Sequence, residues 1–250
     1  MDLRIQGRVA IVTGASRGLG LSTAKALANE GVKVLAAARG VGGIDELAKR
    51  YPEQVAGATY DARDPESGEA LVAAAIERFG GLDILVNNAG IAPASPFLDD
   101  SLDTWRDALA VNVLAPVALT QAAGRVMVEA GTGGKVINIA SLVGVRGKAW
   151  LSAYSASKGA LVRFTEAVAA EWARYDIQVN AIAPGAFATE AQSAVLENDE
   201  LLRKRVAKTM ARRFADPHEM DGLLLLLASP LSRFITGVTY AIDGGELAKL

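Results

Sequence analysis

The sequence predicts a doubly wound α/β fold, in which a parallel sheet of seven strands carries helices on both faces. Short runs of Val, Ile, Leu and Ala alternate along the chain with longer segments of helical periodicity. Strands made of near-continuous apolar residues are buried on both faces, and strands that alternate with helices form parallel sheets. Because no linker, repeat or low-complexity segment divides the chain, we expect one domain over residues 1–250.

The elements are expected in a regular order. Strands are predicted at 8–13, 32–38, 54–60, 82–86, 135–140, 177–182 and 238–242. Helical patterns fill about 18–30, 65–79, 101–130 and 152–174. Gly31 ends the first of these helices, and Pro65 stands in the first turn of the second. Ligands of such folds bind beyond the carboxyl ends of the strands, so the functional residues are expected directly after the strands.

Composition excludes several classes of protein. Hydrophobic residues make up 51% of the chain and charged residues 22%, which is ordinary for a globular protein with a sizeable core. The net charge of −2 and the lack of a basic stripe argue against a nucleic-acid partner. With no cysteine and one histidine, neither a disulfide nor a metal site is expected. No signal pattern and no continuous apolar run of membrane-spanning length is present, so we expect a cytoplasmic protein without membrane contact.

Two further features favour surface roles. The one histidine, His218, follows Asp216 and Pro217, which is typical of a helix start at the surface. The densest group of cations recurs every three to five residues and fits one solvated helix face, with docking of an anion as the alternative. These cations are Arg203, Lys204, Arg205, Lys208, Arg212 and Arg213.

The first strand runs straight into a glycine-rich turn, T-G-A-S-R-G-L-G at 13–20. Glycine allows a sharp turn and a close approach of the backbone to a pyrophosphate. The helix that follows offers free N–H groups and the positive end of its dipole to the anion. The position between strand and helix favours a phosphate site over a purely structural turn, and its predicted residues are Gly14, Ser16, Arg17, Gly18, Leu19 and Gly20.

The end of the second strand bears on the choice between NAD and NADP. An acidic residue there accepts hydrogen bonds from the ribose 2′-hydroxyl of NAD, whereas this chain has Arg39, which favours a 2′-phosphate. Arg17 supplies a second positive charge. NADP(H) is therefore the predicted cofactor, with NAD(H) possible if Arg39 only faces solvent. Asp61, followed by Ala62, is expected to contact the adenine, or else to cap a turn.

Tyr154 and Lys158 lie four residues apart and therefore share one face of a predicted helix. A free tyrosine has a pKa near 10, too high for a base at neutral pH. A nearby ammonium is expected to lower that pKa, which would let the phenol exchange a proton with a carbonyl or alcohol oxygen. Ser141 ends the fifth strand and can hydrogen-bond the same oxygen. The alternative for the pair is an exposed helix face without function.

Together these motifs resemble the short-chain dehydrogenase/reductase family along essentially the whole chain. The glycine turn resembles its cofactor loop, N-N-A-G at 87–90 resembles the segment after its fourth strand, and P-G-A-F-A-T at 184–189 resembles the loop over the nicotinamide. The family's catalytic four are matched without departure by Asn112, Ser141, Tyr154 and Lys158. The resemblance implies a Rossmann fold, hydride transfer with NADP(H), and a homo-oligomer that is usually a tetramer.

The resemblance also implies roles for single residues. Asn112 would interrupt its helix and hold a water that leads to Lys158, although a polar residue there can also simply satisfy nearby backbone groups. Lys158 would bind the nicotinamide ribose. The cofactor would pass along Asn88, Ala89 and Gly90. The nicotinamide and the phosphates would be framed by Pro184, Gly185, Phe187 and Thr189.

The substrate is left open by the sequence. Its pocket is expected between 92–97, 142–150 and a helical lid segment at about 186–213. The chain resembles 3-oxoacyl-acyl carrier protein reductases and sugar or sugar-acid dehydrogenases, which share a fold and catalytic residues. A small carbonyl or alcohol substrate is therefore expected. The alternatives are an NAD-dependent sugar or sugar-acid dehydrogenase and a non-catalytic cofactor sensor or scaffold, in which loss of the tyrosine or lysine would be expected.

Overall fold

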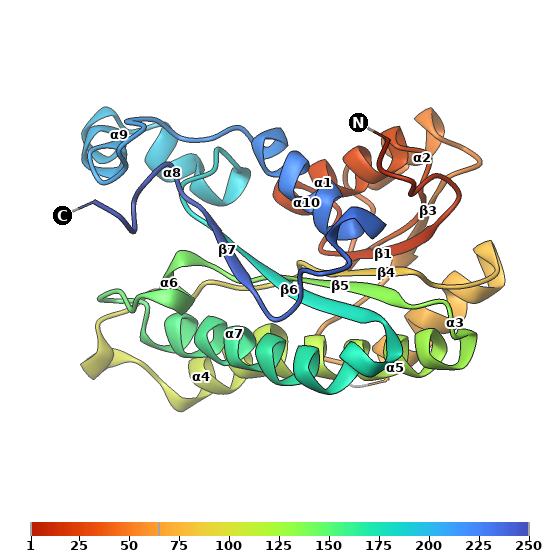
Figure 1. Cartoon of the computed structure of the whole chain (residues 1–250). Helices are drawn as coiled ribbons and strands as arrows, with labels where there is room; N and C mark the ends of the chain where they lie inside the picture. Colours follow the sequence, from red (N-terminus) through yellow and green to blue (C-terminus); the bar gives the residue numbers. More distant parts are fainter. Residues whose placement is uncertain (1, 65, 250) are drawn as a thin grey trace.

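In the computed structural model, which describes residues 2–64 and 66–249, seven parallel strands form one sheet in the order β3-β2-β1-β4-β5-β6-β7 (Figure 1). This confirms the doubly wound α/β fold. The strands are β1 (Val9–Thr13), β2 (Lys33–Ala38), β3 (Val55–Thr59), β4 (Ile84–Asn87), β5 (Gly134–Ile139), β6 (Ile177–Pro184) and β7 (Thr239–Ile242). The strand order reverses between β1 and β4, and such a switch point is where open α/β sheets bind ligands.

Helices cover both faces of the sheet. In Figure 1, α1 and α10 lie above it, and α3, α5 and α7 lie below it. The α-helices are α1 (Gly18–Asn29), α2 (Ile44–Arg50), α3 (Ser67–Phe79), α4 (Leu102–Leu109), α5 (Ala115–Ala130), α6 (Leu142–Val145), α7 (Ser152–Trp172), α8 (Ser193–Leu196), α9 (Asp199–Val206) and α10 (Asp221–Ala228). Within the described residues, five short 3₁₀ turns lie at 97–99, 173–175, 190–192, 217–220 and 230–232, and a π-helical turn lies at Ala110–Leu114.

Each face of the sheet has its own hydrophobic core. Above it, Leu27 of α1 and Leu224 of α10 pack with Val12 and Val34. Below it, side chains of α3 and α5 pack with Ile11, Leu35 and other residues of the central strands. β1 is buried along its whole length, as the unbroken apolar run predicts. The central strands are thereby held rigid, and their carboxyl ends present the loops that follow them.

The sequence placed most elements within two residues of their observed ends. The long helical pattern at 101–130 is interrupted around Asn112 by a π-helical turn, as the family resemblance implies. The cations at 203–213 do not share one helix face, because α9 ends at Val206. The expected helix start at Pro65 lies outside the described residues, and α3 is described from Ser67. His218 lies exposed in the 3₁₀ turn Pro217–Met220, as predicted.

One helical stretch in the described part of the chain, Leu102–Ala130, is long and apolar enough to cross a membrane by length and composition alone, with a mean hydropathy of 1.3. Just over half of its most apolar window, 56%, is buried inside the protein. Leu119 and Ala123 of α5 belong to the core beneath the sheet. Packing against the sheet therefore accounts for the apolar character of this stretch.

Candidate active site

The loops that follow β1 and β4 are tied together by hydrogen bonds. The side-chain amide of Asn88 donates to the carbonyl oxygens of Thr13, at 2.8 Å, and Gly14, at 3.2 Å. The hydroxyl of Thr13 accepts from the backbone N–H groups of Asn88, at 3.0 Å, and Ala89, at 3.1 Å. Thr13 and Asn88 thus fix the glycine turn against the segment at 87–90.

Glycine is required in this turn by close contacts. A Cβ on Gly20 would lie 2.2 Å from the carbonyl oxygen of Gly14 and 2.4 Å from the side-chain nitrogen of Asn88. A Cβ on Gly14 would lie 2.9 Å from the Cα of Ala89, and Gly14 also has a φ of +65°. Such distances leave no room for a side chain, so the backbone of the turn lies bare at the switch point of the sheet.

The start of α1 has the features of a phosphate site. Its N-cap residue, Arg17, makes no side-chain capping bond, and no acidic residue stands in its first turn. The first N–H groups of the helix are therefore left for an external acceptor. The residues present fit a dinucleotide phosphate on these grounds.

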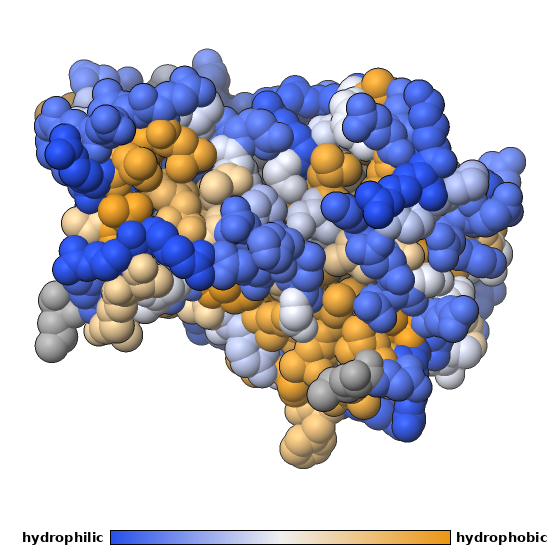
Figure 2. Space-filling model, turned by 90° about the horizontal axis from the view of Figure 1, so that it is seen from above, coloured by the Kyte–Doolittle hydropathy of each residue, from blue (hydrophilic) through white to orange (hydrophobic). Residues whose placement is uncertain are grey.

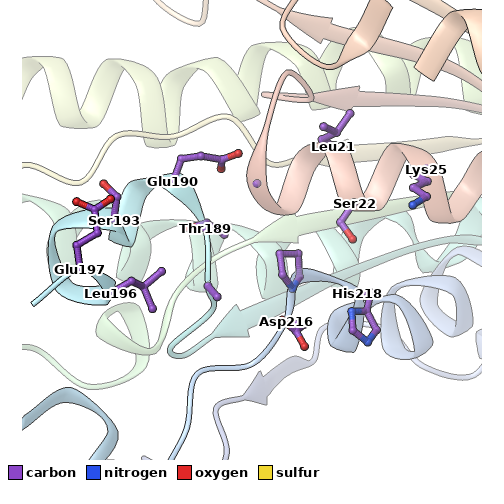
Figure 3. Close-up of a pocket in the computed structure, with 13 residues that line it drawn as sticks. Leu21, Ser22, Lys25, Thr189, Glu190, Ser193, Leu196, Glu197, Asp216 and His218 are labelled. Carbon is purple, nitrogen blue, oxygen red and sulfur yellow. The ribbon is translucent and has the colours of Figure 1, made fainter. Parts of the chain in front are cut away.

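A cavity of about 620 Å³ lies beside the start of α1, between Gly18, Lys25, the segment at 188–197 and Asp216 (Figure 3). In Figure 3 the Glu190 side chain extends toward the turn that precedes α1. A Cβ on Gly18 would lie 3.5 Å from Thr189 and 3.6 Å from a carboxylate oxygen of Glu190. The predicted lid segment therefore begins directly over the glycine turn.

Charged residues gather after β2 and β3. Arg39 is exposed at the end of β2, and Asp61 and Ala62 follow β3. Arg63 donates two hydrogen bonds to Asp107 of α4, at 2.7 and 2.8 Å, and Arg39 lies close enough to help lower the pKa of Asp107. Arg39 and Asp61 therefore lie in one region of the structure. The Arg63–Asp107 ion pair lies there too, and the sequence did not indicate it.

Asn112 links three segments of the site. Its Oδ1 accepts from the N–H of Ile91 at 2.9 Å, and its Nδ2 donates to the carbonyl of Ile91 at 2.8 Å and to the hydroxyl of Ser157 at 2.9 Å. Asn112 is fully buried in the π-helical turn. The predicted interruption of the helix is thus present, and it turns the amide toward α7 and the segment after β4.

Lys158 and Gly90 lie beside Asn112. A Cβ on Gly90 would be 3.1 Å from Asn112 Oδ1 and 3.4 Å from Lys158 Nζ. The ammonium of Lys158, whose side chain is 4% exposed, donates to the carbonyl of Ile139 at 2.7 Å. The structure therefore brings the ends of β4 and β5 and helix α7 to one point.

Ser141 and Tyr154 meet at the carboxyl end of β5. Ser141 caps the short helix α6, and its hydroxyl accepts from the N–H of Val143 at 3.4 Å. Tyr154 stands in the first turn of α7, and its phenol lies close enough to the Ser141 hydroxyl for that group to help lower its pKa. A Cβ on Gly144 would lie 2.6 Å from the backbone of Lys158, so α6 packs tightly against α7. The two hydroxyls thus lie on the same side of the molecule, at the edge where the glycine turn opens.

Burial sets the protonation of the two titrating groups. It raises the pKa of the Tyr154 phenol, and the neighbouring Ser141 hydroxyl opposes that rise only in part. It lowers the pKa of Lys158 to about 8. The sequence predicted instead a phenol made acidic by Lys158. That prediction is wrong for the chain by itself, because desolvation penalises both charged forms.

The loop after β6 packs against the C-terminal segment. A Cβ on Gly185 would lie 2.8 Å from the Cα of Asp243, which places the loop directly on that segment. Phe187, at 3% exposure, belongs to the core above the sheet, and its backbone bridges Ala215. Its side chain is therefore a core residue, and Pro184, Gly185 and Thr189 remain nearer the surface of the loop.

Four supporting residues escaped the sequence reasoning. Thr13 carries a weak signal, because it ends its strand immediately before the glycine turn. Ser157, which accepts the hydrogen bond from Asn112 and donates to the carbonyl of Tyr154 at 2.8 Å, lies among other small residues and carries none. The Arg63–Asp107 pair joins residues far apart in the sequence, so only the fold can show it.

Known proteins resemble this chain over its whole length. A family profile described as enoyl-(acyl carrier protein) reductase matches residues 14–246. The 3-oxoacyl-[acyl-carrier-protein] reductase FabG of Vibrio cholerae is 36% identical, over 97% of this chain and 98% of its own. The galactitol 2-dehydrogenase (L-tagatose-forming) of Cereibacter sphaeroides is 39% identical, over 97% and 96%.

The fold is also shared with solved structures. The crystal structure of a gluconate 5-dehydrogenase from Burkholderia cenocepacia, in complex with NADP and tartrate, has a TM-score of 0.93 and 33% identity, and covers 100% of this chain and 98% of its own. The whole-length matches, the seven-stranded sheet and the site at its carboxyl edge agree with one another. The chain therefore belongs to the short-chain dehydrogenase/reductase family and is an oxidoreductase that acts on CH–OH groups with NAD(P).

Proposed function

We propose that this protein is an NADP(H)-dependent oxidoreductase that interconverts a ketone and a secondary alcohol, with Tyr154 as the general acid and base. The observation that carries the proposal is the meeting of Tyr154 and Ser141 at the carboxyl end of β5. Buried Lys158 and the glycine turn lie at the same edge of the sheet. A proton donor and a hydrogen-bond donor are thereby available to one substrate oxygen.

When bound, the cofactor supplies the hydride chemistry. The phenol of Tyr154 donates a proton to the substrate oxygen in reduction and removes one in oxidation. The hydroxyl of Ser141 hydrogen-bonds the same oxygen as negative charge develops on it. Because burial raises the pKa of Tyr154, the phenol keeps its proton at neutral pH, and this favours the role of proton donor.

Lys158 and Asn112 hold the rest of the proton path. Lys158 is anchored to the carbonyl of Ile139 and lies next to Gly90, where it can bind the nicotinamide ribose. Asn112 hydrogen-bonds Ser157 of α7 and Ile91 of the segment after β4, and it thereby holds both segments near Lys158. We propose that a water held by Asn112 connects Lys158 to solvent and returns the proton to the site.

The cofactor preference is proposed from two arginines. Arg39 at the end of β2 and Arg17 at the start of α1 are exposed cations on either side of the adenosine end of the proposed site, where a 2′-phosphate would lie. NADP is also the cofactor in the structure of the gluconate 5-dehydrogenase. Replacing Arg39 with Ala is expected to raise the KM for NADP by about tenfold or more and to leave the KM for NAD within a factor of about three. An unchanged preference for NADP would disprove the role of Arg39.

The names of the relatives support three candidate substrate classes. Their names describe a reductase of 3-oxoacyl thioesters, a galactitol dehydrogenase and a gluconate dehydrogenase. We propose that this chain acts on a small carbonyl or alcohol compound of one of these classes. An NAD-dependent sugar or sugar-acid dehydrogenase is the second candidate, favoured by the relatives that act on sugars.

The decisive test uses two variants with a panel of ketones, polyols, sugar acids and 3-oxoacyl thioesters. Tyr154→Phe removes the proton donor while keeping the ring, and Ser141→Ala removes the second hydroxyl. Tyr154→Phe is expected to lower kcat by a factor of about 100 or more with intact cofactor binding. Turnover that survives this change would overturn the mechanism. Cofactor binding without turnover of any compound by the wild type would favour a sensor or scaffold instead.

The remaining expectations concern lid, assembly and location. We propose that residues 186–213 form a lid over a single catalytic domain, because they carry short helices and begin over the glycine turn. We also propose a cytoplasmic location, as the sequence predicts. A homotetramer is proposed because Phe234, Leu98 and Leu102 are apolar and exposed. Light scattering of the purified protein is expected to give the mass of four 26.0 kDa chains, and a monomer would refute the assembly.

A further inference from the structure

Arg205 differs from its basic neighbours on α9, because it points inward. Its Nη2 donates to Glu246 at 2.8 Å, and the two side chains are only 18% and 20% exposed. Its Nη1 is buried and has no hydrogen-bond partner among the described residues. By contrast, exposed Lys204 pairs with Glu200 on the same helix. An unsatisfied buried N–H group is costly, so Arg205 keeps one donor that a further acceptor would stabilise.

Lys148 approaches this ion pair from the catalytic loop, the segment 142–151 that joins Ser141 to α7. Burial lowers the pKa of Lys148, nearby Arg205 and Lys208 lower it further, and Glu246 opposes them. Lys148 and Lys208 both reach solvent. Lys148 is therefore close enough to interact with the charges of Arg205, Lys208 and Glu246, and the cluster of these four groups carries an excess of positive charge.

The cluster lies on the substrate side of the site. Glu246 belongs to the C-terminal segment, which is shaped by Asp243 through hydrogen bonds from Gly245 at 2.9 Å and Leu247 at 2.7 Å. Asp243 itself packs on Gly185 in the loop after β6. The cations therefore stand between the predicted lid and the loop that carries the catalytic hydroxyls.

The catalytic loop is held in an unusual conformation beside the cluster. Trp150 has a φ of +70°, which is costly for a bulky residue, and its carbonyl accepts from the N–H of Ser95 at 2.9 Å. The same two segments also expose apolar side chains, since Trp150 and Val145 of the catalytic loop and Met210 of the lid segment are 70%, 51% and 56% exposed. Figure 2, which views the molecule from above, shows hydrophobic residues between hydrophilic ones on the side that carries α8 and α9 in Figure 1.

We propose that Lys148, Lys208 and Arg205 bind a carboxylate of the substrate, so that the protein acts on a hydroxy acid or its oxo acid. This inference rests on the proposed oxidoreductase function and specifies its substrate class. A carboxylate between the catalytic loop and α9 offsets the repulsion among the cations, and a guanidinium and two ammonium groups supply charged donors. Binding of the acid thereby draws the lid segment onto the catalytic loop.

The charges on and after α9 offer little to an acidic carrier protein as the source of the anion. Lys204 is paired with Glu200, and Arg213 makes two hydrogen bonds to Glu219, at 2.6 and 2.7 Å. These two cations are neutralised by their own neighbours, whereas exposed Arg203 donates to the backbone carbonyl of Asp199. Lys148, Lys208 and Arg205 instead come from the catalytic loop and the lid segment, where a small acid fits better than a protein surface.

The test compares matched substrates and matched variants. Gluconate and galactonate are each paired with the uncharged polyol of the same configuration, and a 3-oxoacyl thioester is included. Lys148→Met and Lys208→Met are compared with Lys204→Met, which removes an exposed cation from the same helix. Each of the first two is expected to lower kcat/KM for the acids about tenfold, mainly through KM, with the polyols changed less than about threefold. Lys204→Met is expected to change neither.

Calorimetric titration provides a readout without turnover, when the same acids are added to the protein with NADP⁺ bound. Added salt is expected to weaken acid binding in the wild type but not in Lys148→Met or Lys208→Met. Three results would overturn the carboxylate site and leave the oxidoreductase function standing. They are an equal loss of kcat/KM on acids and polyols, a preference of the wild type for a polyol or thioester, and failure to bind any of the acids. Activity that survives Tyr154→Phe would overturn that function instead.

Discussion

The side-chain amide of Asn88 occupies the space next to Gly20, so that a Cβ on Gly20 would come within 2.4 Å of its nitrogen. The same amide donates to the carbonyls of Thr13 and Gly14. One side chain from the segment after β4 therefore holds the shape of the turn after β1. The bare backbone at the switch point depends on this contact between residues that are far apart in the sequence.

Replacing Gly20 with Ala is expected to disrupt this contact. The new Cβ would lie 2.2 Å from the carbonyl oxygen of Gly14, which is backbone and has no room to move. We expect a loss of about 2–4 kcal/mol in the free energy of unfolding and a KM for NADP raised by about tenfold or more. Urea unfolding and cofactor titration measure the two effects. A variant with unchanged cofactor binding would show that the turn does not hold the pyrophosphate.

Gly222 provides the matched control in another helix. It is exposed near the start of α10, and a Cβ there would meet nothing within 4 Å. Glycine is destabilising within a helix because it leaves the unfolded chain more freedom. Gly222→Ala is therefore expected to raise the free energy of unfolding by about 0.5–1 kcal/mol without changing activity. A decrease in stability would mean that the contacts at this position have been misjudged.

Asn112 is expected to combine a structural and a positioning role. Asn112→Ala removes the partners of the N–H and carbonyl of Ile91 and of the Ser157 hydroxyl, all of them in buried or partly buried surroundings. The free energy of unfolding is expected to fall by about 2–4 kcal/mol. We also expect kcat to fall by a larger factor than the factor by which KM changes. Asn112→Asp, which keeps the acceptor toward Ile91, is expected to recover part of the stability. Equal kinetics in the wild type and Asn112→Ala would limit the residue to a structural role.

Much of the fold was predictable because its signals are local. The apolar run that forms β1 and the glycines that follow it lie within twelve consecutive residues, Val9–Gly20. Parallel sheets gather the carboxyl ends of their strands at one edge, so the order of the motifs was enough to bring Ser141 and Gly14 to the same edge. Tyr154, Lys158 and Ser141 had physical signals of their own in the four-residue spacing and the end of the fifth strand, whereas the role of Asn112 was predicted from its resemblance to a family pattern.

Other features depend on packing and escaped prediction. The pKa of Tyr154 is raised because the surrounding fold buries the phenol, and Lys158 is not among the groups that oppose this rise. The cations after Asp199 looked like one helix face, whereas α9 stops at Val206 and Arg205 finds Glu246 near the end of the chain. Phe187 stands in a loop motif, but its side chain completes the core above the sheet.

The two buried lysines are expected to make stability rise with pH. Burial lowers the pKa of Lys158 and of Lys135 from 10.5 to about 8. Between pH 8 and 10.5 the unfolded chain therefore binds more protons than the folded chain, so the free energy of unfolding increases with pH. We expect a gain of about 1–2 kcal/mol from each lysine between pH 8 and 10. Above pH 10 the trend reverses in part, because burial raises the pKa of Tyr60 to about 12.

Lys135 separates this effect from other titrations. It lies at the start of β5, away from the carboxyl edge, and its ammonium donates to Gln178 at 2.6 Å and to Ser232 at 3.2 Å. Lys135→Met is expected to remove about half of the rise in unfolding free energy between pH 8 and 10, while exposed Lys49→Met leaves the rise unchanged. Urea unfolding at a series of pH values measures both. A rise that is as large in Lys135→Met as in the wild type would show that the Lys135 ammonium is not destabilised by its burial.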